Sequence, residues 1–208
     1  MNLTLVKHGD GVHRCSWCGD IPEYIQYHDT EWGMPVASDQ RLFEKIVLEG
    51  FQSGLSWITI LRKRAAFRAG FAGFDIEKVA RFTRTDVERL VLDAGIVRHR
   101  GKIESAINNA KRARELIEAK GSLAKFVWSF KPDKASRKQL ITPEYASTLT
   151  QSAESVALSK ELKRLGFSFV GPTTMYAFMQ SMGVVNDHLE GCAGRVTVET
   201  ATKKFQIP

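Results

Sequence analysis

Four residues whose side chains bind transition metals lie in two pairs, one near each end of the chain. Cys15 and His28 stand near its start, and His188 and Cys192 stand near its end. If the four side chains meet, two thiolates and two imidazoles form a closed tetrahedral Zn²⁺ site of the structural kind, with no position left for a reactive water. Such an ion would join the N-terminal segment to the C-terminal one, and the chemistry would lie elsewhere.

The spacing of these residues leaves alternatives open. His188 and Cys192 are four residues apart and can share one side of a helical turn. Cys15 and His28 have no such relation, and Cys18 forms a local CxxC pair with Cys15 that could supply both sulfurs. The four residues could also be ordinary buried cysteines and surface histidines that bind no metal.

A second chemical grouping lies in the first 60 residues, where aromatic side chains surround one acid. Glu49 falls in a segment of apolar helical spacing, and a buried carboxylate without a partner is costly. Aromatic rings could stack on a base turned out of a nucleic acid, while the carboxylate accepts hydrogen bonds from its polar edge. A plain aromatic core is the alternative, although it leaves Glu49 unexplained. The aromatic residues are Trp17, Tyr24, Tyr27, Trp32 and Trp57.

A basic turn between two predicted helices could bind phosphate. The turn runs from Gly95 to Gly101, and the second helix begins near Lys102. The unpaired N–H groups and the dipole at a helix start favour an anion, and Arg98, Arg100 and Lys102 add positive charge. This pattern is typical of a helix-hairpin-helix DNA-binding element near residues 85–115, which contacts phosphates without reading sequence. An ordinary helical hairpin with a basic tip fits the segment equally well.

The composition indicates a soluble globular protein that attracts polyanions. The chain has 208 residues, of which 43% are hydrophobic, and a formal net charge of +7. This length fits one well-buried core or two small lobes around a cleft, and the charge favours a nucleic-acid partner. Three cysteines argue against a secreted disulfide framework and for a reducing cytoplasm. We see no signal peptide and no apolar run approaching the ~20 residues that span a bilayer, so no membrane partner is expected.

Hydrophobic spacing predicts an almost entirely helical protein. A long helix should run from near Lys102 to Lys120, the segment 131–150 should be a loop, and the tail after Cys192 should be frayed. We find no alternating strand pattern longer than residues 167–170. Other helices should start at capping residues or a first-turn proline, namely Ser38, Ser56, Asp75, Thr85 with Glu88 as a capping box, Ser122, Ser152 or Ser155, and Pro172.

Several longer strings closely resemble the bacterial DNA-3-methyladenine glycosylase I family. The resemblance covers residues 14–192, with about ten extra N-terminal residues, Pro172 and the tail as departures. It implies an all-α helix-hairpin-helix glycosylase fold with one structural zinc ion. The strings are YHDTEWG (27–33), LEGFQSGLSWITIL (48–61), DAGIVRHRGKI (93–103), FVWSF (126–130), GFSFVGPTTMYAFMQSMGVVNDH (166–188) and HLEGC (188–192).

The resemblance also implies an activity. A DNA repair enzyme of this family would flip 3-methyladenine out of alkylated double-stranded DNA and hydrolyse its N-glycosidic bond, leaving an abasic site and the free base. The reaction would be monofunctional. The protein would be a bacterial, cytoplasmic monomer, one unit over residues 1–208 with two helical lobes around a base-binding cleft.

Carried over residue by residue, the family pattern assigns both groupings. Its zinc ligands fall on Cys15, His28, His188 and Cys192, which leaves Cys18 outside the site. Its base-pocket glutamate falls on Glu49, the expected catalytic residue. Its stacking aromatics fall on Trp17, Tyr27 and Trp57, with Tyr24 and Trp32 lining the same region.

One absence agrees with this activity. Glycosylases of the helix-hairpin-helix class that remove neutral bases generally carry an aspartate shortly after the hairpin, and no aspartate occurs from Lys102 to Pro132. A 3-methyladenine base in DNA is cationic, so it departs as a neutral group and needs less assistance.

Two other functions remain as alternatives. His188 and Glu190 form the HxE of zinc deaminases, but the PCxxC that should follow is missing. A DNA-binding module without catalysis would use the same hairpin and metal site, and would leave the aromatic residues around Glu49 without a purpose.

Overall fold

Helices supply nearly all regular structure in residues 3–137 and 140–208, the part of the chain that the computed structural model describes. Within that part, β1 (Leu5–Lys7) and β2 (His13–Cys15) form the one antiparallel hairpin. No helix among the same residues is long and apolar enough to cross a membrane. The helices are α1 (Pro22–Thr30), α2 (Asp39–Gln52), α3 (Trp57–Gly70), α4 (Ile76–Ala80), α5 (Arg84–Leu92), α6 (Arg100–Lys120), α7 (Leu123–Trp128), α8 (Pro143–Thr148), α9 (Ala153–Arg164), α10 (Pro172–Ser181) and α11 (Ala193–Lys204).

Most helices begin where the sequence placed a cap. The Ser38 hydroxyl accepts a hydrogen bond from the Arg41 amide at the start of α2, and Ser122 and Ser152 cap α7 and α9 in the same way. Pro172 occupies the first position of α10, where a missing N–H costs nothing. The helical class predicted from the spacing is therefore confirmed.

One predicted cap is wrong. Helix α5 begins after Thr83, whose N–H and hydroxyl both donate to the Asp86 carboxylate, whereas Thr85 and Glu88 lie inside the helix. Both pairs have the same three-residue spacing, so the sequence alone did not distinguish them.

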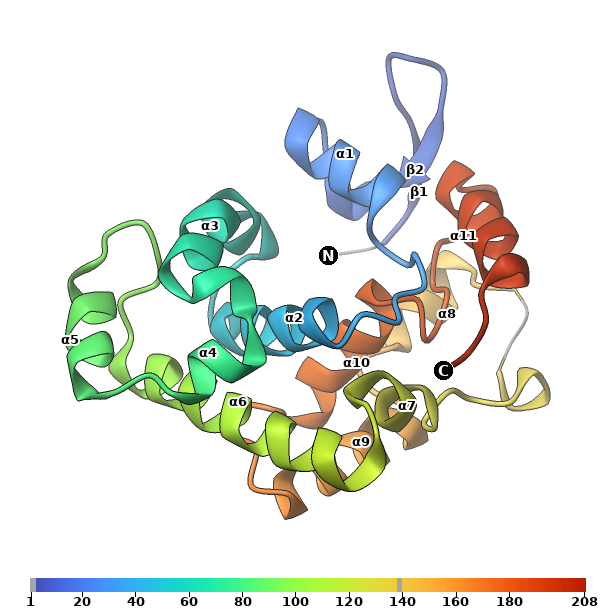
Figure 1. Cartoon of the computed structure of the whole chain (residues 1–208). Coiled ribbons are helices and arrows are strands. Elements are labelled where there is room, and N and C mark those ends of the chain that lie inside the picture. Colours follow the sequence, from blue (N-terminus) through green and yellow to red (C-terminus); the bar gives the residue numbers. More distant parts are fainter. Residues whose placement is uncertain (1–2, 138–139) are drawn as a thin grey trace.

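Helix α2 crosses the middle of the molecule and packs against α3, α6, α7 and α10 (Figure 1). Every residue from Leu42 to Phe51 is buried. Because helices surround α2, its polar side chains Glu44, Lys45 and Glu49 are enclosed along with its apolar ones. Charged groups in such a position need partners inside the protein.

The N-terminal hairpin and the last helix lie side by side, where α11 packs against α1 and β2 (Figure 1). The prediction of a frayed tail after Cys192 is wrong, because Val198 gives α11 a buried contact. The segment 131–150, predicted to be a loop, contains helix α8 and a 3-10 turn, Lys134–Ser136. Residues 138 and 139 of that segment lie outside the described residues.

Gly183, just after α10, allows the closest backbone approach in the site region. Its φ is +72°, and a Cβ there would lie 2.6 Å from the Gly33 carbonyl oxygen and 2.5 Å from the Pro35 nitrogen. The glycine thus lets the segment after α1 lie directly against the turn after α10. This contact places residues 184–188, including His188, beside the end of α1.

Candidate functional site

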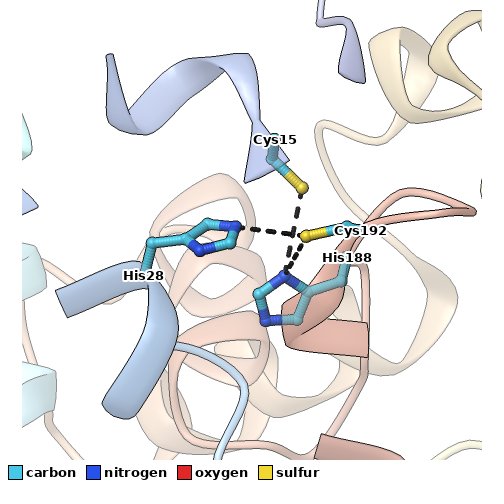
Figure 2. Close-up of side chains that lie close together, drawn as sticks. All are labelled: Cys15, His28, His188 and Cys192. Atoms are coloured by element: carbon cyan, nitrogen blue, oxygen red, sulfur yellow. Dashed lines mark hydrogen bonds between the residues drawn. The ribbon is translucent and has the colours of Figure 1, made fainter. Parts of the chain in front are cut away.

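Cys15, His28, His188 and Cys192 converge in one buried cluster (Figure 2). Their ligand atoms all lie within 4.8 Å of one another. The Cys192 sulfur is 3.4 Å from His28 Nε2 and 3.5 Å from His188 Nδ1, and the Cys15 sulfur is 3.9 Å from the same His188 Nδ1. The structure thus brings together all four predicted ligands in a cluster that could hold a metal ion. We call these four residues the metal cluster.

Each histidine in the cluster has its outer ring nitrogen engaged by an acceptor. His28 Nδ1 lies 2.8 Å from Asp29 Oδ1, and His188 Nε2 lies 3.1 Å from the Trp32 carbonyl oxygen. Metal-binding histidines are typically oriented in this way, because the outer acceptor fixes the tautomer that leaves the inner nitrogen free to bind the ion. Asp29 is itself held by the Arg14 guanidinium.

The local backbone supports this cluster closely. A Cβ on Gly194 would lie 2.4 Å from His188 Cε1, so a side chain there would displace the imidazole. The contacts of the Cys192 sulfur with Cys15 and with the two imidazoles lower the pKa of its thiol. Cys18 takes no part in the cluster, since its thiol donates to the Cys15 carbonyl oxygen 3.2 Å away, and the local CxxC alternative is wrong.

The deaminase alternative does not fit this geometry. Glu190 is exposed, pairs with Arg195 at 3.5 Å and is absent from the cluster. Two cysteines and two histidines fill a tetrahedral shell, so an ion there would have no place for a reactive water.

A cavity of about 370 Å³ opens beside the metal cluster. All five predicted aromatic residues and Glu49 line it. Helices α1, α2, α3, α8 and α10 all contribute to its walls, so it lies where distant parts of the chain meet. The lining residues are Leu3, Trp17, Tyr24, Tyr27, Trp32, Glu49, Gln52, Trp57, Ala146, Ser147, Leu149, Ala177, Gln180 and Asp187.

Glu49 is the buried acid of this cavity, with a relative exposure of 5%. Burial raises the pKa of its carboxyl, while the Lys45 ammonium 3.6 Å away and the Ser181 hydroxyl oppose that rise. Sequence reasoning missed Lys45, although it stands one helical turn before Glu49. The carboxylate is thus paired, and it remains able to accept a hydrogen bond inside the cavity.

The aromatic rings form a continuous wall between the cavity and the metal cluster. Ring centroids are 5.5 Å apart for Tyr27 and Trp57 and 5.0 Å apart for Trp17 and Trp32. Trp17 also lies 5.2 Å from the His28 ring, and Trp32 lies 4.6 Å from the His188 ring. The metal cluster therefore supports the cavity directly.

Two indole groups in this wall are donors without partners. The Nε1 atoms of Trp17 and Trp57 are buried and have no hydrogen-bond partner among residues 3–137 and 140–208. A buried donor without a partner is costly. Both residues line the cavity, but their indole N–H groups are themselves covered by neighbouring protein atoms.

Sequence reasoning also missed polar residues on the far side of the cavity. Asp187 is buried and accepts hydrogen bonds from the Tyr176 hydroxyl at 2.6 Å, from the Gln180 amide at 2.9 Å and from the Arg137 guanidinium. These three donors occupy its oxygens, so the carboxylate holds the side chains of Tyr176, Gln180 and Arg137 together at the wall of the cavity. Its position just before His188 was the signal in the sequence.

The predicted helix-hairpin-helix consists of α5, the turn at 93–99 and α6. Within the turn the Gly95 amide donates to Asp93 Oδ1 at 2.7 Å, and the Lys63 ammonium donates to the carbonyl oxygen of Ala94 at 2.9 Å. Helix α3, which carries Trp57, is thereby tied to the hairpin. Arg98 in the turn is exposed, and Gly101 lies in the first turn of α6.

The basic residues of the hairpin differ in how far their charged groups are already bonded within the protein. Arg100 forms a bidentate pair with Glu88. Lys102 is a correction to the predicted set, because its side chain is buried and its ammonium donates to the carbonyl oxygens of Phe51 and Ser53. Its amide also donates to the side chain of His99. Lys102 holds the end of α2 in place through these two bonds, so its ammonium is engaged inside the protein.

The sequence matches a known family over most of its length. A family model described as methyladenine glycosylase matches residues 17–195. The chain is 49% identical to DNA-3-methyladenine glycosylase 1 of Escherichia coli over 181 residues, which is 87% of this chain and 96% of that protein.

Solved structures agree with this match. A crystal structure of 3-methyladenine DNA glycosylase I superposes with a TM-score of 0.80 at 46% identity, over 86% of this chain and 98% of that one. The Staphylococcus aureus enzyme, studied for its recognition of 3-methyladenine, superposes with a TM-score of 0.81 at 36% identity, over 88% of this chain and 96% of that one. The predicted glycosylase fold is therefore confirmed.

Proposed function

This chain belongs to the methyladenine glycosylase family, and on that premise we propose that it excises 3-methyladenine from alkylated double-stranded DNA. The N-glycosidic bond is hydrolysed and an abasic site remains. The observation that carries the proposal is a buried carboxylate, Glu49, inside an aromatic cavity large enough for a purine. The chain acts as one unit, a cytoplasmic monomer whose two helical lobes enclose this cavity.

The cavity has the groups that a flipped purine needs. Trp17, Tyr27 and Trp57 offer ring faces for stacking, and Tyr24 and Trp32 extend the same wall. Glu49 accepts hydrogen bonds from the amino group or ring N–H of the base.

The charge of the lesion explains why such a cavity is sufficient. When the glycosidic bond of a cationic base breaks, the electron pair stays with the base, which leaves as a neutral molecule. The positive charge passes to the sugar, which takes hydroxide from water while a proton is released. Glu49 lines the cavity, and the oxygens of Asp187, the other acid there, are taken up by three donors. We therefore assign to Glu49 the stabilisation of developing positive charge.

DNA is held on both sides of the cavity mouth in this proposal. The exposed Arg98, with Arg100 and the backbone at Gly101, contacts phosphates, whereas the Gly95 amide is already bonded to Asp93. Leu55 is 42% exposed on the short loop between Gln52 and Trp57, two residues that line the cavity. An apolar side chain there can fill the gap that a flipped base leaves in the stack.

We further propose that the metal cluster binds one Zn²⁺ ion. The donor set fits, because two thiolates neutralise the ion and two imidazoles complete a tetrahedral shell. Cys15, His28, His188 and Cys192 would hold it, and it would supply cross-linking of the fold rather than a reactive water. Elemental analysis of purified protein should give one zinc per chain.

Release of free base from methylated duplex DNA tests the activity. We expect 3-methyladenine and no 7-methylguanine, separated by chromatography. Glu49→Gln and Trp57→Ala should each reduce release at least ~100-fold, the scale of a lost charge-stabilising group, while the exposed Glu118→Gln should match wild type. A folded, zinc-loaded protein that binds undamaged DNA and releases no base would contradict the proposal and favour a DNA-binding module.

A further inference from the structure

One residue that lines the base cavity, the space bordered by Glu49 and the aromatic rings, lies outside the family match. The family model matches residues 17–195. Leu3 precedes that range, and it lines the cavity together with Glu49 and the aromatic residues. The cavity of this chain therefore has a wall residue that the family pattern does not supply.

Backbone hydrogen bonds fix the position of Leu3. The amide of the next residue, Thr4, donates to the Ser16 hydroxyl at 2.9 Å, and the Ser16 amide donates to the Thr4 carbonyl oxygen at 2.8 Å. The pairing of β1 with β2 continues this ladder. Because Ser16 directly precedes Trp17, these bonds hold Leu3 close to one of the aromatic residues of the cavity.

The two leucines of this segment differ in what they cover. Side chains two residues apart in an extended segment point to the same side, and Leu3 and Leu5 both pack against the small apolar cluster that contains Ile141 and Leu189. Leu5 is absent from the cavity lining. It lies against the turn at Gly191, where an added Cβ would be 3.0 Å from the leucine side chain. Leu5 thus anchors the segment, and Leu3 covers part of the cavity.

Leu3 belongs to an apolar part of the cavity wall. The hydrogen-bonding side chains of Glu49 and Gln180 come from α2 and α10. The apolar part comes from other segments, namely the residues before β1, the turn after β2 and the region of α8. Its members all line the cavity and all pack against the same small apolar cluster, and they are Leu3, Trp17, Ala146 and Leu149.

We propose that Leu3 limits the size of the alkyl group that a base can carry in this cavity. This inference rests on the proposed function and narrows its substrate class to adenines with a small alkyl group on N3. Because the polar edge of the base is hydrogen-bonded by Glu49, its alkyl group is left to the apolar part of the wall. A methyl group packs against Leu3, and a longer chain collides with it.

The fixed position of Leu3 makes such a collision costly. The leucine cannot move aside without breaking the hydrogen bonds of Thr4 with Ser16 and its own contacts with the apolar cluster. A single methylene in an apolar pocket changes selectivity by roughly 10-fold to 200-fold. Shortening Leu3 to alanine removes the branched end of the side chain, which leaves room for a substituent of similar size.

Binding of two small ligands tests the inference directly. One is 3-methyladenine and the other is 3-propyladenine, which carries a longer chain on the same nitrogen. Dissociation constants at pH 7 would be measured by calorimetry for wild type, Leu3→Ala and Leu3→Phe. We expect Leu3→Ala to shift the affinity ratio toward 3-propyladenine by at least ~10-fold. Leu3→Phe, which fills more of the cavity, should shift the ratio the other way.

Leu5→Ala is the matched control. It makes the same change in the same segment but outside the cavity lining. It should lower the thermal midpoint, as Leu3→Ala does, and leave the affinity ratio at its wild-type value. A purely structural role of Leu3 would make the two alanine variants alike in their affinity ratios. Circular dichroism establishes which variants are folded, and the two Leu3 variants provide independent measurements.

The outcomes separate the two proposals. If wild type releases 3-methyladenine from DNA but the affinity ratio of a folded Leu3 variant changes less than ~3-fold, or changes equally in Leu5→Ala, the role of Leu3 is overturned while the glycosylase function stands. If wild type binds neither ligand and releases no base, the proposed function itself fails, and the role of Leu3 fails with it. Larger and opposite shifts in the two Leu3 variants, with none in Leu5→Ala, support the role of Leu3.

Discussion

The molecule contains two buried polar groupings that share a wall and differ in how their charge is balanced. In the metal cluster, two cysteines and two histidines converge, all four of them buried and with their ligand atoms within 4.8 Å of one another. In the base cavity, Glu49 is paired with Lys45 of the same helix, and the pair borders about 370 Å³ of open space. Trp17 and Trp32 touch both groupings.

The difference indicates what each grouping does. If the first grouping binds an ion, that ion balances its thiolates, and the free energy of metal binding becomes free energy of folding. The second is balanced by the chain itself, at a cost in desolvation that a stable fold does not require. Such a cost is reasonable where the charge acts on a ligand, which agrees with the proposed chemistry in the cavity.

Removing the metal should have the largest effect. A chelator should lower the thermal midpoint by at least ~10 °C, because structural zinc contributes several kcal/mol or more and each kcal/mol shifts the midpoint by a few degrees. Cys192→Ser should act in the same way, and Cys18→Ser, outside the cluster, should act much less. Scanning calorimetry measures the shift, and an unchanged midpoint after verified metal removal would show that the cluster does not hold the fold together.

Replacing the ion pair of Lys45 and Glu49 by apolar residues should stabilise the fold, whereas removing the metal should destabilise it. The double variant Lys45→Met, Glu49→Leu should be more stable than wild type by about 1–4 kcal/mol and release no base, because a buried ion pair often stabilises less than apolar packing. Lys45→Met alone should be less stable than the double variant, since the carboxyl remains buried. Urea unfolding provides the values. A double variant less stable than wild type would mean that the pair supports the fold as the metal does.

Asp29→Asn should weaken metal binding without removing a ligand. The Asp29 carboxylate contacts His28 Nδ1 at 2.8 Å, and losing such an outer contact typically costs tenfold to hundredfold in affinity. Asp10→Asn is the matched control, because Asp10 also pairs with Arg14 but has no contact with the histidine. Competition with a chromophoric chelator gives the affinities. Equal affinities for the two variants would rule out this role.

The smallest expected effect is on how the free energy of unfolding depends on pH. Burial lowers the pKa of Lys45 to about 8 from its usual 10.5. Between those values the unfolded chain holds a proton that the folded chain has lost, so this group makes stability rise with pH, by at most about 1.4 kcal/mol per unit. Unfolding from pH 7.5 to 9.5 should show a steeper rise for wild type than for Lys45→Met. Parallel curves would mean that Lys45 is solvated as an ordinary lysine.

Residue types and family strings were sufficient to predict which side chains meet in the metal cluster and which line the base cavity. The spacing of the cysteines and histidines left a local CxxC alternative open, and the family strings assigned the four ligands; the aromatic residues around Glu49 were concentrated enough to suggest a stacking site. All four predicted ligands meet in one cluster, and the five aromatic residues line one cavity. The helix starts were predictable because capping depends on local hydrogen bonds.

What the sequence missed depends on burial by distant segments. Lys45 was not singled out and Lys102 was predicted to contact phosphate, and only the packing around α2 makes them internal donors. Helix α11 lacked an obvious apolar stripe, and its stability comes from contacts with α1 and β2 near the other end of the chain. Short-range patterns do not report such contacts.

The wall shared by cavity and cluster has a consequence for synthesis. Trp17, Tyr24, Tyr27 and Trp32 are made within the first 32 residues, yet the groups that anchor them, His188 and Cys192, are made more than 150 residues later. A ribosome-bound fragment that stops before residue 188 therefore exposes these rings without fixing them. The wall of the cavity can therefore be completed only after the C-terminal segment has been synthesised.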